Sequence, residues 1–340
     1  MNQAINIALV GASGVVGTKI MQLLEKKAFA INNFYPLGSS SVGQEVTLNG
    51  DIHSIGDTNT FDASLAQLTI FAAGSSVADK HARAFVEAGS YVIDLSSHFR
   101  YEDDVPLIIP EINGKLVENL TGPALIANPN CSTAQLLMAL KPIHDELTIE
   151  FINIATYQAV SGTGKAAVEE LNNQTYFSES NHEPEVYPKQ IAFNAIPQCD
   201  VFLDNAFTKE EMKLVWETHK ILDPNINVQA TCVRVPVFNG HSEAVFFKTT
   251  NSSSREALID LLSKTPGIKV LDNPDLLEYP TPAEHANDTE EVFVGRIRVQ
   301  EFAKDTWVSL WIVADNVYGK GAALNAVQIA QTLVNSNKFQ

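Results

Sequence analysis

One cysteine stands in a context that can activate a thiol for nucleophilic attack. Cys131 lies in the segment Asn128-Pro129-Asn130-Cys131-Ser132-Thr133, and the run Leu136–Leu140 that follows consists of good helix formers. Pro129 favours an extended conformation in the residue before it, so we expect Cys131 at the start of a helix whose length Pro142 limits. Unpaired backbone N–H groups and the positive end of the helix dipole favour a thiolate there. A buried structural cysteine is the ordinary alternative, but this context favours a nucleophile.

The composition fits a folded protein and argues against several kinds of partner. A chain of 340 residues exceeds one ordinary hydrophobic core, so we expect two domains. A hydrophobic content of 45% and a net charge of -17 indicate a folded protein without a nucleic-acid partner. The three cysteines, Cys131, Cys199 and Cys232, have neither disulfide-framework nor metal-ligand spacing, so no metal is expected. No apolar run reaches the ~20 residues of a membrane span, and no basic leader is recognisable. We therefore expect no membrane contact and a cytoplasmic location.

The N-terminal segment has the order of a dinucleotide-binding unit. The apolar run Ile5–Val10 predicts a buried strand, and Thr18–Lys26 predicts an amphipathic helix. Between them lies the turn Gly11-Ala12-Ser13-Gly14-Val15-Val16-Gly17. Glycines in such a turn let the backbone approach a pyrophosphate at the helix N-terminus. A simple tight turn is the alternative, but the position between strand and helix favours cofactor binding.

The segment that would meet the adenosine ribose lacks a carboxylate. An NAD site usually places an acidic residue there, about 20 residues after the glycine turn. This chain has Tyr35-Pro36-Leu37-Gly38-Ser39-Ser40-Ser41-Val42-Gly43 at that point. Nothing in the segment repels a 2′-phosphate, and its hydroxyls can bond to one, so it favours NADP. A Ser/Gly-rich surface loop is the alternative interpretation.

Strand and helix patterns alternate early in the chain and change after Lys141. Leu68–Ala72, Val77–Ala88 and Tyr91–Leu95 predict strand, helix and strand, as in a doubly wound parallel sheet. The later strand-like runs are Ile149–Gln158, Val228–Val237, Ser242–Thr249, Val292–Val299 and Thr306–Ala314. The predicted class is α/β: a Rossmann-type doubly wound parallel sheet domain plus an α+β domain with a mixed or antiparallel sheet. We expect the first domain over residues 1–130 with the C-terminal helix in 315–340, and the second over 131–314.

Several charged side chains stand near expected strand ends or on helix faces. Arg100 follows the strand Tyr91–Leu95, where parallel sheets bind ligands, and could clamp an anion or form a surface salt bridge. Thr208 caps a helix on which Glu210 and Lys213 share one face, an arrangement that is usually a solvated ion pair. His241 taken alone is more often a structural histidine than an acid or base. These alternatives remain open on the residues alone.

A set of short motifs follows in order along nearly the whole chain. They are the N-terminal glycine turn, Ser97-His98-Phe99-Arg100-Tyr101, Asn128-Pro129-Asn130-Cys131-Ser132-Thr133, Tyr157-Gln158-Ala159-Val160-Ser161-Gly162, Glu210-Glu211-Met212-Lys213, Arg234-Val235-Pro236-Val237, Gly240-His241-Ser242-Glu243, Ala314-Asp315-Asn316 and Gly321-Ala322-Ala323. Each motif alone is a weak signal. Their order and spacing together resemble the aspartate-semialdehyde dehydrogenase family.

The resemblance implies NADPH-dependent reduction of 4-phospho-L-aspartate to L-aspartate 4-semialdehyde with release of phosphate, in lysine, threonine and methionine biosynthesis. It implies that Cys131 is the nucleophile and His241 the acid/base. The substrate would meet Arg100 and Lys213 at its phosphate, Glu210 at its amino group, and Arg234, Gln158 and Asn130 elsewhere. The cofactor would meet Gly11, Ser13, Gly14, Val15, Val16, Ser39, Ser40, Ser161, Gly162 and Asn316. The second domain would be the catalytic and dimerisation domain of a homodimer.

The chemistry agrees with these residue types. An acyl phosphate needs a soft nucleophile that forms a thioester. Arg and Lys can neutralise the departing phosphate, and the pKa of His suits proton transfer near neutral pH. The rivals are an N-acetyl-glutamyl-phosphate reductase, which shares the cysteine chemistry, and a catalytically silent paralogue that acts as a binding protein. The Glu210/Lys213 helix and Arg234 favour an amino-acid substrate with free charges.

Overall fold

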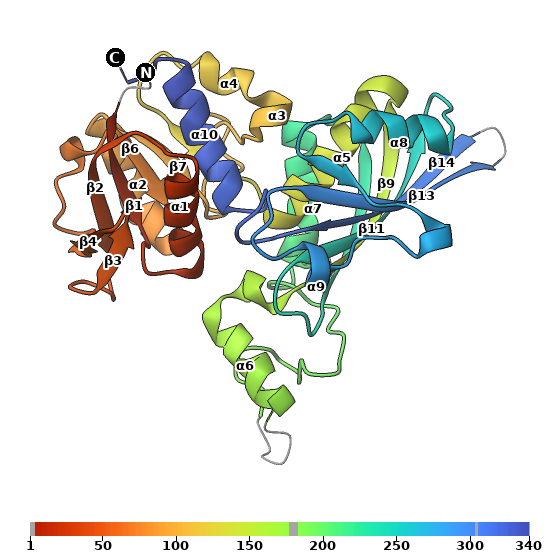
Figure 1. Ribbon diagram of the computed structural model, residues 1–340, viewed down its shortest axis with the longest axis horizontal. Helices are drawn as coiled ribbons and strands as arrows, with labels where there is room; N and C mark the ends of the chain where they lie inside the picture. Colours follow the sequence, from red (N-terminus) through yellow and green to blue (C-terminus); the bar gives the residue numbers. More distant parts are fainter. Residues whose placement is uncertain (1–3, 177–182, 303–304, 340) are drawn as a thin grey trace. The chain divides into compact units, whose positions relative to one another are not determined.

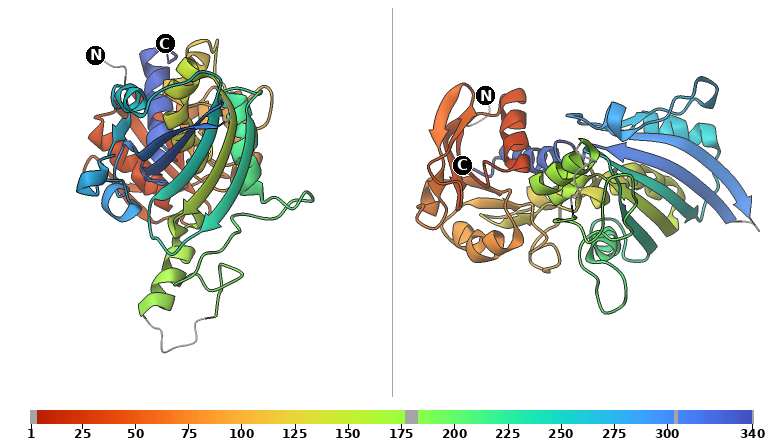
Figure 2. Two further views of the ribbon diagram at one scale, coloured as in Figure 1. Left: turned by 90° about the vertical axis from the view of Figure 1, so that its right-hand side faces the viewer. Right: turned by 90° about the horizontal axis from the view of Figure 1, so that it is seen from below.

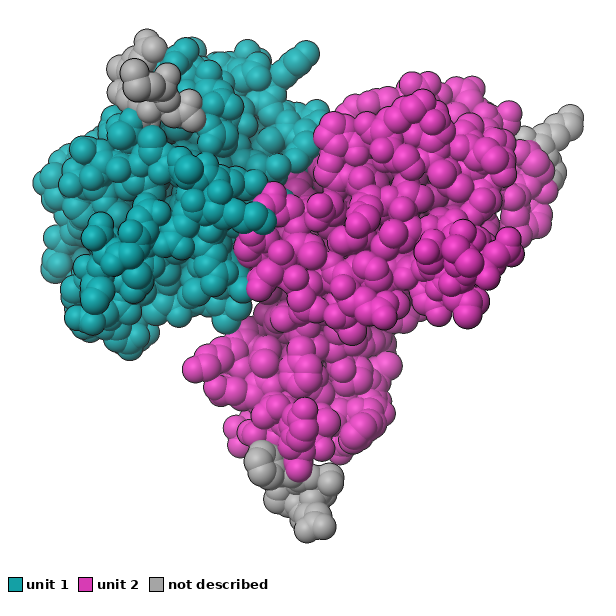
Figure 3. Space-filling model, viewed as in Figure 1, with its two compact units in different colours: residues 1–129, 322–340 teal, residues 130–321 magenta. Residues whose placement is uncertain are grey.

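The computed structural model describes residues 4–176, 183–302 and 305–339. The chain divides into two compact units, residues 1–129 with 322–340 (unit 1) and residues 130–321 (unit 2) (Figure 3). The sequence predicts divisions after residues 130 and 314, whereas the units divide after residues 129 and 321. Among the described residues, no helix is both long and apolar enough to cross a membrane.

Unit 1 is built on a parallel sheet of six strands in the order β5-β2-β1-β6-β7-β8 (Figure 1). The strands are β1 Ile5–Val10, β2 Ile31–Gly38, β5 Gly56–Asp57, β6 Leu68–Phe71, β7 Tyr91–Asp94 and β8 Leu125–Ala127. Every neighbouring pair runs parallel. The residues of β6 and β7 are all buried, as expected for strands covered on both faces. The strand order reverses between β1 and β6, where such sheets bind ligands. The predicted doubly wound parallel sheet is confirmed.

Helices and a small hairpin complete unit 1. They are α1 Val15–Lys26, η1 Ala63–Leu65, α2 Ser75–Glu87, α3 Pro110–Asn113, α4 Lys115–Glu118, α10 Ala323–Asn335, and the hairpin of β3 Glu45–Leu48 with β4 Asp51–Ser54. α10, from the end of the chain, packs against α1, α3 and α4. Its buried Asn325 Nδ2 donates to the Ile108 carbonyl (2.9 Å) and to Asn128 Oδ1 (2.8 Å). The C-terminal helix thereby holds the segment that leads to the cysteine.

Unit 2 is built on a mixed sheet of six strands in the order β10-β9-β11-β14-β13-β12, seen in the left view of Figure 2. The strands are β9 Ile149–Gln158, β10 Asn227–Arg234, β11 His241–Thr249, β12 Ile268–Val270, β13 Val292–Phe302 and β14 Asp305–Ala314. The pairs β9/β10 and β12/β13 are parallel, and the other three pairs are antiparallel. The helices are α5 Cys131–Leu147, η2 Val160–Thr163, α6 Lys165–Tyr176, α7 Lys209–Ile221, α8 Arg255–Ser263, η3 Pro274–Leu276 and α9 Pro282–His285. The predicted mixed or antiparallel sheet is confirmed.

The helix that begins at Cys131 is longer than the sequence suggests. Pro142 lies inside α5, which continues to Leu147, so the expectation that Pro142 limits the helix is wrong. Proline in a helix interior removes one backbone hydrogen bond and strains the preceding turn. Burial outweighs that cost here, because α5 packs on β9, β11, β13 and β14, and residues 132–140 of the helix are all buried.

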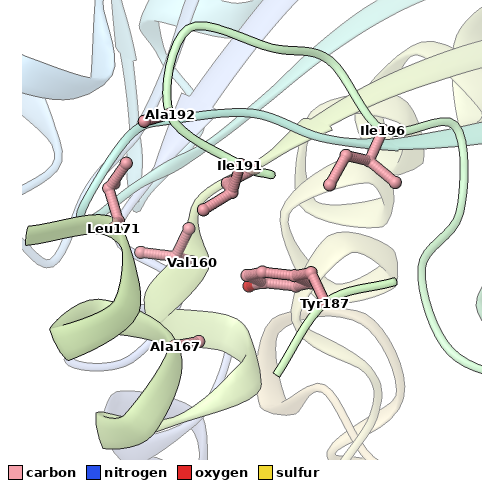
Figure 4. Close-up of a cluster of buried hydrophobic side chains, with 7 residues drawn as sticks. All are labelled: Val160, Ala167, Leu171, Tyr187, Ile191, Ala192 and Ile196. Carbon is pink, nitrogen blue, oxygen red and sulfur yellow. The ribbon is translucent and has the colours of Figure 1, made fainter. Parts of the chain in front are cut away.

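A second small core anchors the segment after β9. Seven buried side chains form it, namely Val160, Ala167, Leu171, Tyr187, Ile191, Ala192 and Ile196 (Figure 4). They come from η2, α6 and the loop over residues 187–196, so α6 packs this loop against the chain at Val160. The side chain of Gln174 on α6 also accepts from the backbone N–H of Ile191 (3.0 Å). Ser161 and Gly162 therefore stand on a packed support.

The helix α7 is fixed at its N-terminus by the predicted Thr208 cap. Thr208 Oγ1 accepts from the Glu211 N–H (3.2 Å), and Glu211 Oε2 accepts from the Thr208 N–H (2.6 Å). The other oxygen of Glu211 accepts from the N–H of Cys232 on β10 (3.1 Å). This capping box satisfies helix-end donors and also ties α7 to the sheet. It sets which face of α7 turns inward.

We expect Thr208→Ala to destabilise the protein by about 1–2 kcal/mol, because it leaves the buried Glu211 N–H without its acceptor. Urea unfolding followed by circular dichroism measures the change. Thr208→Ser, which keeps the hydroxyl, is the matched control and should stay close to the original stability. An alanine variant as stable as the serine variant would contradict the capping account.

Candidate active site

Cys131 is the first residue of α5, and Asn130 is its N-cap. Asn130 Oδ1 accepts from the N–H groups of Ser132 (2.9 Å) and Thr133 (3.2 Å). Cys131 is partly exposed, whereas Cys199 and Cys232 are buried. Burial raises the pKa of Cys199 to about 12 and raises that of Cys232 well above its usual value. Cys131 is therefore the cysteine placed for reaction with a ligand.

Two carboxylates of α7 hold the Asn130 cap in place. Glu210 Oε1 accepts from Asn130 Nδ2 (2.9 Å), and Glu217 Oε2 accepts from the Asn130 backbone N–H (2.6 Å). Glu217 is fully buried. Sequence reasoning missed it, although its spacing of seven residues from Glu210 places both on one helix face. The nucleophile turn is thus fixed through both the side chain and the backbone of Asn130.

Gln158 joins the same cluster from the end of β9. Its Nε2 donates to Ser132 Oγ (2.8 Å) and to Glu210 Oε1 (3.1 Å). Glu210 therefore contacts both Asn130 and Gln158, and all three are substrate residues expected from the sequence. A strand, a helix N-terminus and a helix face supply one residue each.

Lys213 is buried between two carboxylates and is not part of a solvated pair. Its Nζ lies 2.8 Å from Glu210 Oε2 and 2.8 Å from Asp200 Oδ2. Burial alone would raise the pKa of Glu210, but the Lys213 ammonium and hydrogen bonds from Lys213, Asn130 and Gln158 outweigh it and lower that pKa to about 2. The two carboxylates likewise raise the pKa of Lys213 against the effect of burial. The cluster is charged at neutral pH. Asp200, an acidic residue in a loop, gave no signal in the sequence.

His241 opens β11 and is fully buried. The Ala159 N–H donates to its Nδ1 (3.1 Å), while Nε2 has no hydrogen-bond partner within the described parts of the chain. Burial, followed by the charge of Arg234, lowers the pKa of His241 to about 3. The ring is therefore neutral, and since Nδ1 accepts, its proton sits on Nε2.

Arg234, at the end of β10, lies beside His241. Its NH1 donates to the Ala159 carbonyl (2.7 Å), and its buried Nε has no partner in residues 4–176, 183–302 and 305–339. Gly162 packs against both side chains, because a Cβ there would stand 3.2 Å from Arg234 NH1 and 3.2 Å from His241 Nε2. Buried donors without acceptors are costly. Arg234 Nε and His241 Nε2 together fit a ligand that carries oxygen acceptors.

Two further predicted residues, Ser161 and Asn316, lie next to this cluster. Asn316 Nδ2 donates to Ser161 Oγ (3.1 Å), and Asn316 Oδ1 accepts from the N–H of Gly240 (2.9 Å), the residue before His241. At the nucleophile, a Cβ on Gly321 would stand 2.8 Å from the Cys131 Cβ. A larger residue at position 321 would therefore collide with the Cys131 side chain.

Arg100 belongs to unit 1, where it is buried. Its Nε donates to the Asn128 carbonyl (2.8 Å) and its NH2 to the Leu95 carbonyl (3.0 Å). With only 6% of its surface exposed, Arg100 is not a surface salt-bridging residue, so that alternative is wrong. Its part in phosphate binding stays a prediction.

The cofactor residues expected in unit 1 gather at one edge of the parallel sheet. Gly11 has φ +86°, and a Cβ there would stand 2.5 Å from the Ala72 carbonyl oxygen, so the turn requires glycine. The Gly11 N–H donates to the Leu37 carbonyl at the end of β2 (2.8 Å). Because β1 and β2 are adjacent and parallel, their carboxyl ends share this edge. The exposed residues here are Ser13, Gly14 and Val15 at the start of α1, with Val16 half-buried, and Ser39 and Ser40 directly after β2.

The start of α1 fits the phosphates of a dinucleotide. Its N-cap is Gly14, which has no side chain to accept from the first backbone N–H groups. Those donors are available to an anion, and the helix dipole favours one. No three His, Cys, Asp or Glu side chains of the described residues are grouped as a metal site.

Comparison with known proteins shows that this chain is similar to semialdehyde dehydrogenases. Residues 6–120 match the family model "Semialdehyde dehydrogenase, NAD binding domain", and residues 140–318 match "Semialdehyde dehydrogenase, dimerisation domain". The aspartate-semialdehyde dehydrogenase of Shewanella sp. (strain DB6705) is 47% identical over 98% of this chain and 99% of its own.

Two solved structures extend the comparison. The aspartate semialdehyde dehydrogenase II of Vibrio cholerae, complexed with ASA, has a TM-score of 0.94 at 44% identity and covers 98% of this chain and 99% of its own. The enzyme of Candida albicans with NADP has a TM-score of 0.77 at 25% identity and covers 99% of this chain and 100% of its own.

We expect Glu210→Gln to destabilise the protein by about 3 kcal/mol near neutral pH, because the folded state holds the pKa of Glu210 far below its usual value. A carboxyl whose pKa is lowered on folding stabilises the protein above its unfolded pKa. That contribution disappears as the pH falls through the folded value. The difference between variant and original protein should therefore shrink between about pH 4.5 and pH 2.

Denaturant unfolding at a series of pH values measures this difference. Glu169→Gln is the matched control, since Glu169 pairs with Lys165 at the surface, where ion pairs contribute little. A loss of stability for Glu210→Gln that does not depend on pH would contradict the assignment of an ionised, buried carboxylate.

Proposed function

This chain belongs to the aspartate-semialdehyde dehydrogenase family, and from that premise we propose that it reduces 4-phospho-L-aspartate to L-aspartate 4-semialdehyde with NADPH and releases phosphate. The observation that carries the proposal is the cluster of unit 2. Cys131 lies between Asn130 and Ser132, which hydrogen bonds join to Gln158 and the anionic Glu210. His241 and Arg234 present buried donors that have no acceptor among the described residues.

In the first half of the reaction, Cys131 forms a thioester. The thiolate attacks the acyl carbon, the new C–S bond forms, and the bond to the phosphate oxygen breaks with its electron pair leaving on phosphate. Glu210, ionised at neutral pH, binds the substrate ammonium. Arg234 and Gln158 bind the rest of the amino acid, with Asn130 holding the turn. Lys213 and Arg100 are the phosphate residues that the family resemblance implies.

In the second half, the thioester becomes the aldehyde. A nicotinamide cofactor, when bound, would supply the hydride. The carbonyl oxygen then carries negative charge, and His241 Nε2–H, with the proton fixed there by the Ala159 N–H on Nδ1, donates to it. Collapse of the adduct breaks the C–S bond and returns the thiolate, so no net proton is consumed. Because its pKa is lowered to about 3, His241 is neutral and serves here as a hydrogen-bond donor at Nε2, whereas the acid/base role that the resemblance implies stays a prediction.

NADP rather than NAD is part of the proposal. Ser39 and Ser40 are exposed directly after β2, and no carboxylate lies between Tyr35 and Gly43. The Candida albicans relative is described with NADP. Ser13, Gly14, Val15 and Val16 would hold phosphate through the start of α1, while Ser161, Gly162 and Asn316 keep their expected cofactor role as predictions.

The partner we propose is a second copy of the chain, since residues 140–318 match a dimerisation domain. The cytoplasmic location expected from the sequence stays a prediction.

Turnover tests the substrate. The protein is mixed with NADP, phosphate and aspartate semialdehyde, and the absorbance of the reduced nicotinamide is followed. We expect a rise with this aldehyde and none with N-acetyl-glutamate semialdehyde. The reverse pattern would select an N-acetyl-glutamyl-phosphate reductase, and silence with both aldehydes would indicate a binding protein.

Cys131→Ala should lower turnover by about 10⁴-fold or more while NADPH binding, followed by its fluorescence, is kept. Cys131→Ser should be nearly as damaging, because an alkoxide is much harder to form than a thiolate. Cys199→Ser is the control, since Cys199 is buried and its thiol pKa is raised to about 12. Substantial turnover in the alanine variant would rule out the covalent route.

Ser39→Asp should raise the KM for NADP by about tenfold or more and leave that for NAD little changed, because a carboxylate repels the 2′-phosphate. Ser39→Asn is the uncharged control. Equal effects on both cofactors would argue against a 2′-phosphate at this loop.

A further inference from the structure

A buried carboxyl lies two residues after His241, on the same face of β11. Glu243 is fully buried, and its neighbours across the sheet are Thr156 on β9 and Ile312 on β14, neither of which is ionisable. On α5, Gln135 is fully buried one turn after Cys131. Gln135 Nε2 lies 3.4 Å from the His241 carbonyl oxygen, in hydrogen-bonding position. Gln135 therefore links α5, the helix that begins with Cys131, to β11, the strand that begins with His241.

Several polar atoms around Glu243 have no hydrogen-bond partner among the described residues. Both oxygens of Glu243, Gln135 Oε1 and Thr156 Oγ1 are buried without a hydrogen bond in the part of the chain that the structure describes. An ionised carboxylate buried in this way would need several donors. A protonated carboxyl needs fewer donors and itself carries one O–H donor. Gln135 Oε1 is a buried acceptor to which this O–H could donate.

Electrostatics agree with the geometry. Burial raises the pKa of Glu243 well above its usual value, and the neighbouring Gln135 amide opposes that rise more weakly. The amide is near enough to favour the charged form, yet it makes no hydrogen bond of good geometry to either oxygen. Burial and the lack of a partner for either oxygen within the described residues therefore favour the neutral carboxyl over the carboxylate.

We propose that Glu243 is a positioning residue that, as a neutral carboxylic acid, joins β11 to α5 through Gln135 and so fixes His241 relative to Cys131. Its O–H donates to Gln135 Oε1, while the Gln135 amide donates to the His241 carbonyl. The inference rests on the proposed function for its effect on rate, because only then does the placement of His241 matter. The protonation state of Glu243 does not rest on it.

The protonation state is tested by stability alone. A carboxyl with a raised folded pKa must take up a proton on folding once the pH exceeds its unfolded pKa of about 4.3. As the pH rises above that value, the folding equilibrium constant of the original protein should fall, relative to that of Glu243→Gln, by up to about tenfold for each pH unit. Urea unfolding of both proteins between pH 5 and pH 8 gives the ratio. A ratio that does not change with pH would overturn the neutral acid.

The positioning role is tested by steady-state kinetics of the full-length protein. Glu243→Ala should lower kcat by about tenfold or more with KM for aspartate semialdehyde changed less than about threefold, since Glu243 does not touch the substrate. Glu243→Gln, which can still donate to Gln135, should restore kcat to within about threefold. Val245→Ala is the control, because Val245 is buried on the same face of β11 and loses packing without a polar group.

Each arm can fail separately. If Glu243→Ala and Val245→Ala lower kcat equally, Glu243 is merely structural, and if Glu243→Gln is as slow as Glu243→Ala, a charged carboxylate is required. Both outcomes overturn the proposal. Failure of the proposed function would instead appear as a lack of turnover in the unmodified protein, with the pH-dependent stability ratio intact.

Discussion

The site depends on how Asn130 is held. Its side chain caps α5, and two carboxylates of α7 take its remaining donors, Glu210 from the amide nitrogen and Glu217 from the backbone. Both carboxylates are buried, so each hydrogen bond is strong and the loss of either is costly. The position of Cys131 follows directly, since it is the next residue. The capping box at Thr208 belongs to the same constraint, because it orients the face of α7 that carries both acids.

The neighbours of each buried ionisable group then determine whether it is charged. Glu210 has Lys213 and two amides and stays ionised, whereas His241 has a cation beside it and stays neutral. Burial raises the pKa of Glu243 well above its usual value, and neither of its oxygens has a hydrogen-bond partner among the described residues, which favours the proposed neutral acid. One unit thus presents a fixed anion, a fixed N–H donor and a thiol at a helix start. These are complementary to a substrate with an ammonium, an oxygen that gains charge, and an electrophilic carbon.

Much of the fold could be predicted, because short-range patterns of apolar residues and glycines determine most of its strands and helices. The strand Ile149–Gln158 is found with its predicted bounds. The glycine segment does follow β1, but α1 begins at Val15 and not at the predicted Thr18, so Val15, Val16 and Gly17 belong to the helix. The effect of Pro142 is mispredicted because the cost of one lost hydrogen bond is local, while the packing that offsets it comes from four strands that follow α5 in the chain, three of them distant in sequence. At the site, Glu217, Asp200 and Glu243 were missed as functional candidates because each is an unremarkable acid in sequence. Only the fold shows that Glu217 and Glu243 are buried and that Asp200 lies 2.8 Å from the Lys213 ammonium. Arg100 likewise could not be distinguished from a surface arginine without its two carbonyl acceptors.

The central claim is that the sulfur at the start of α5 carries the acyl group. Mass spectrometry of the protein incubated with 4-phospho-L-aspartate, with cofactor withheld, tests this claim most directly. The account predicts an aspartyl adduct on the peptide that contains Cys131, which disappears when NADPH is added and aldehyde is formed. A protein that turns over the acyl phosphate but never carries an adduct at Cys131 would contradict it.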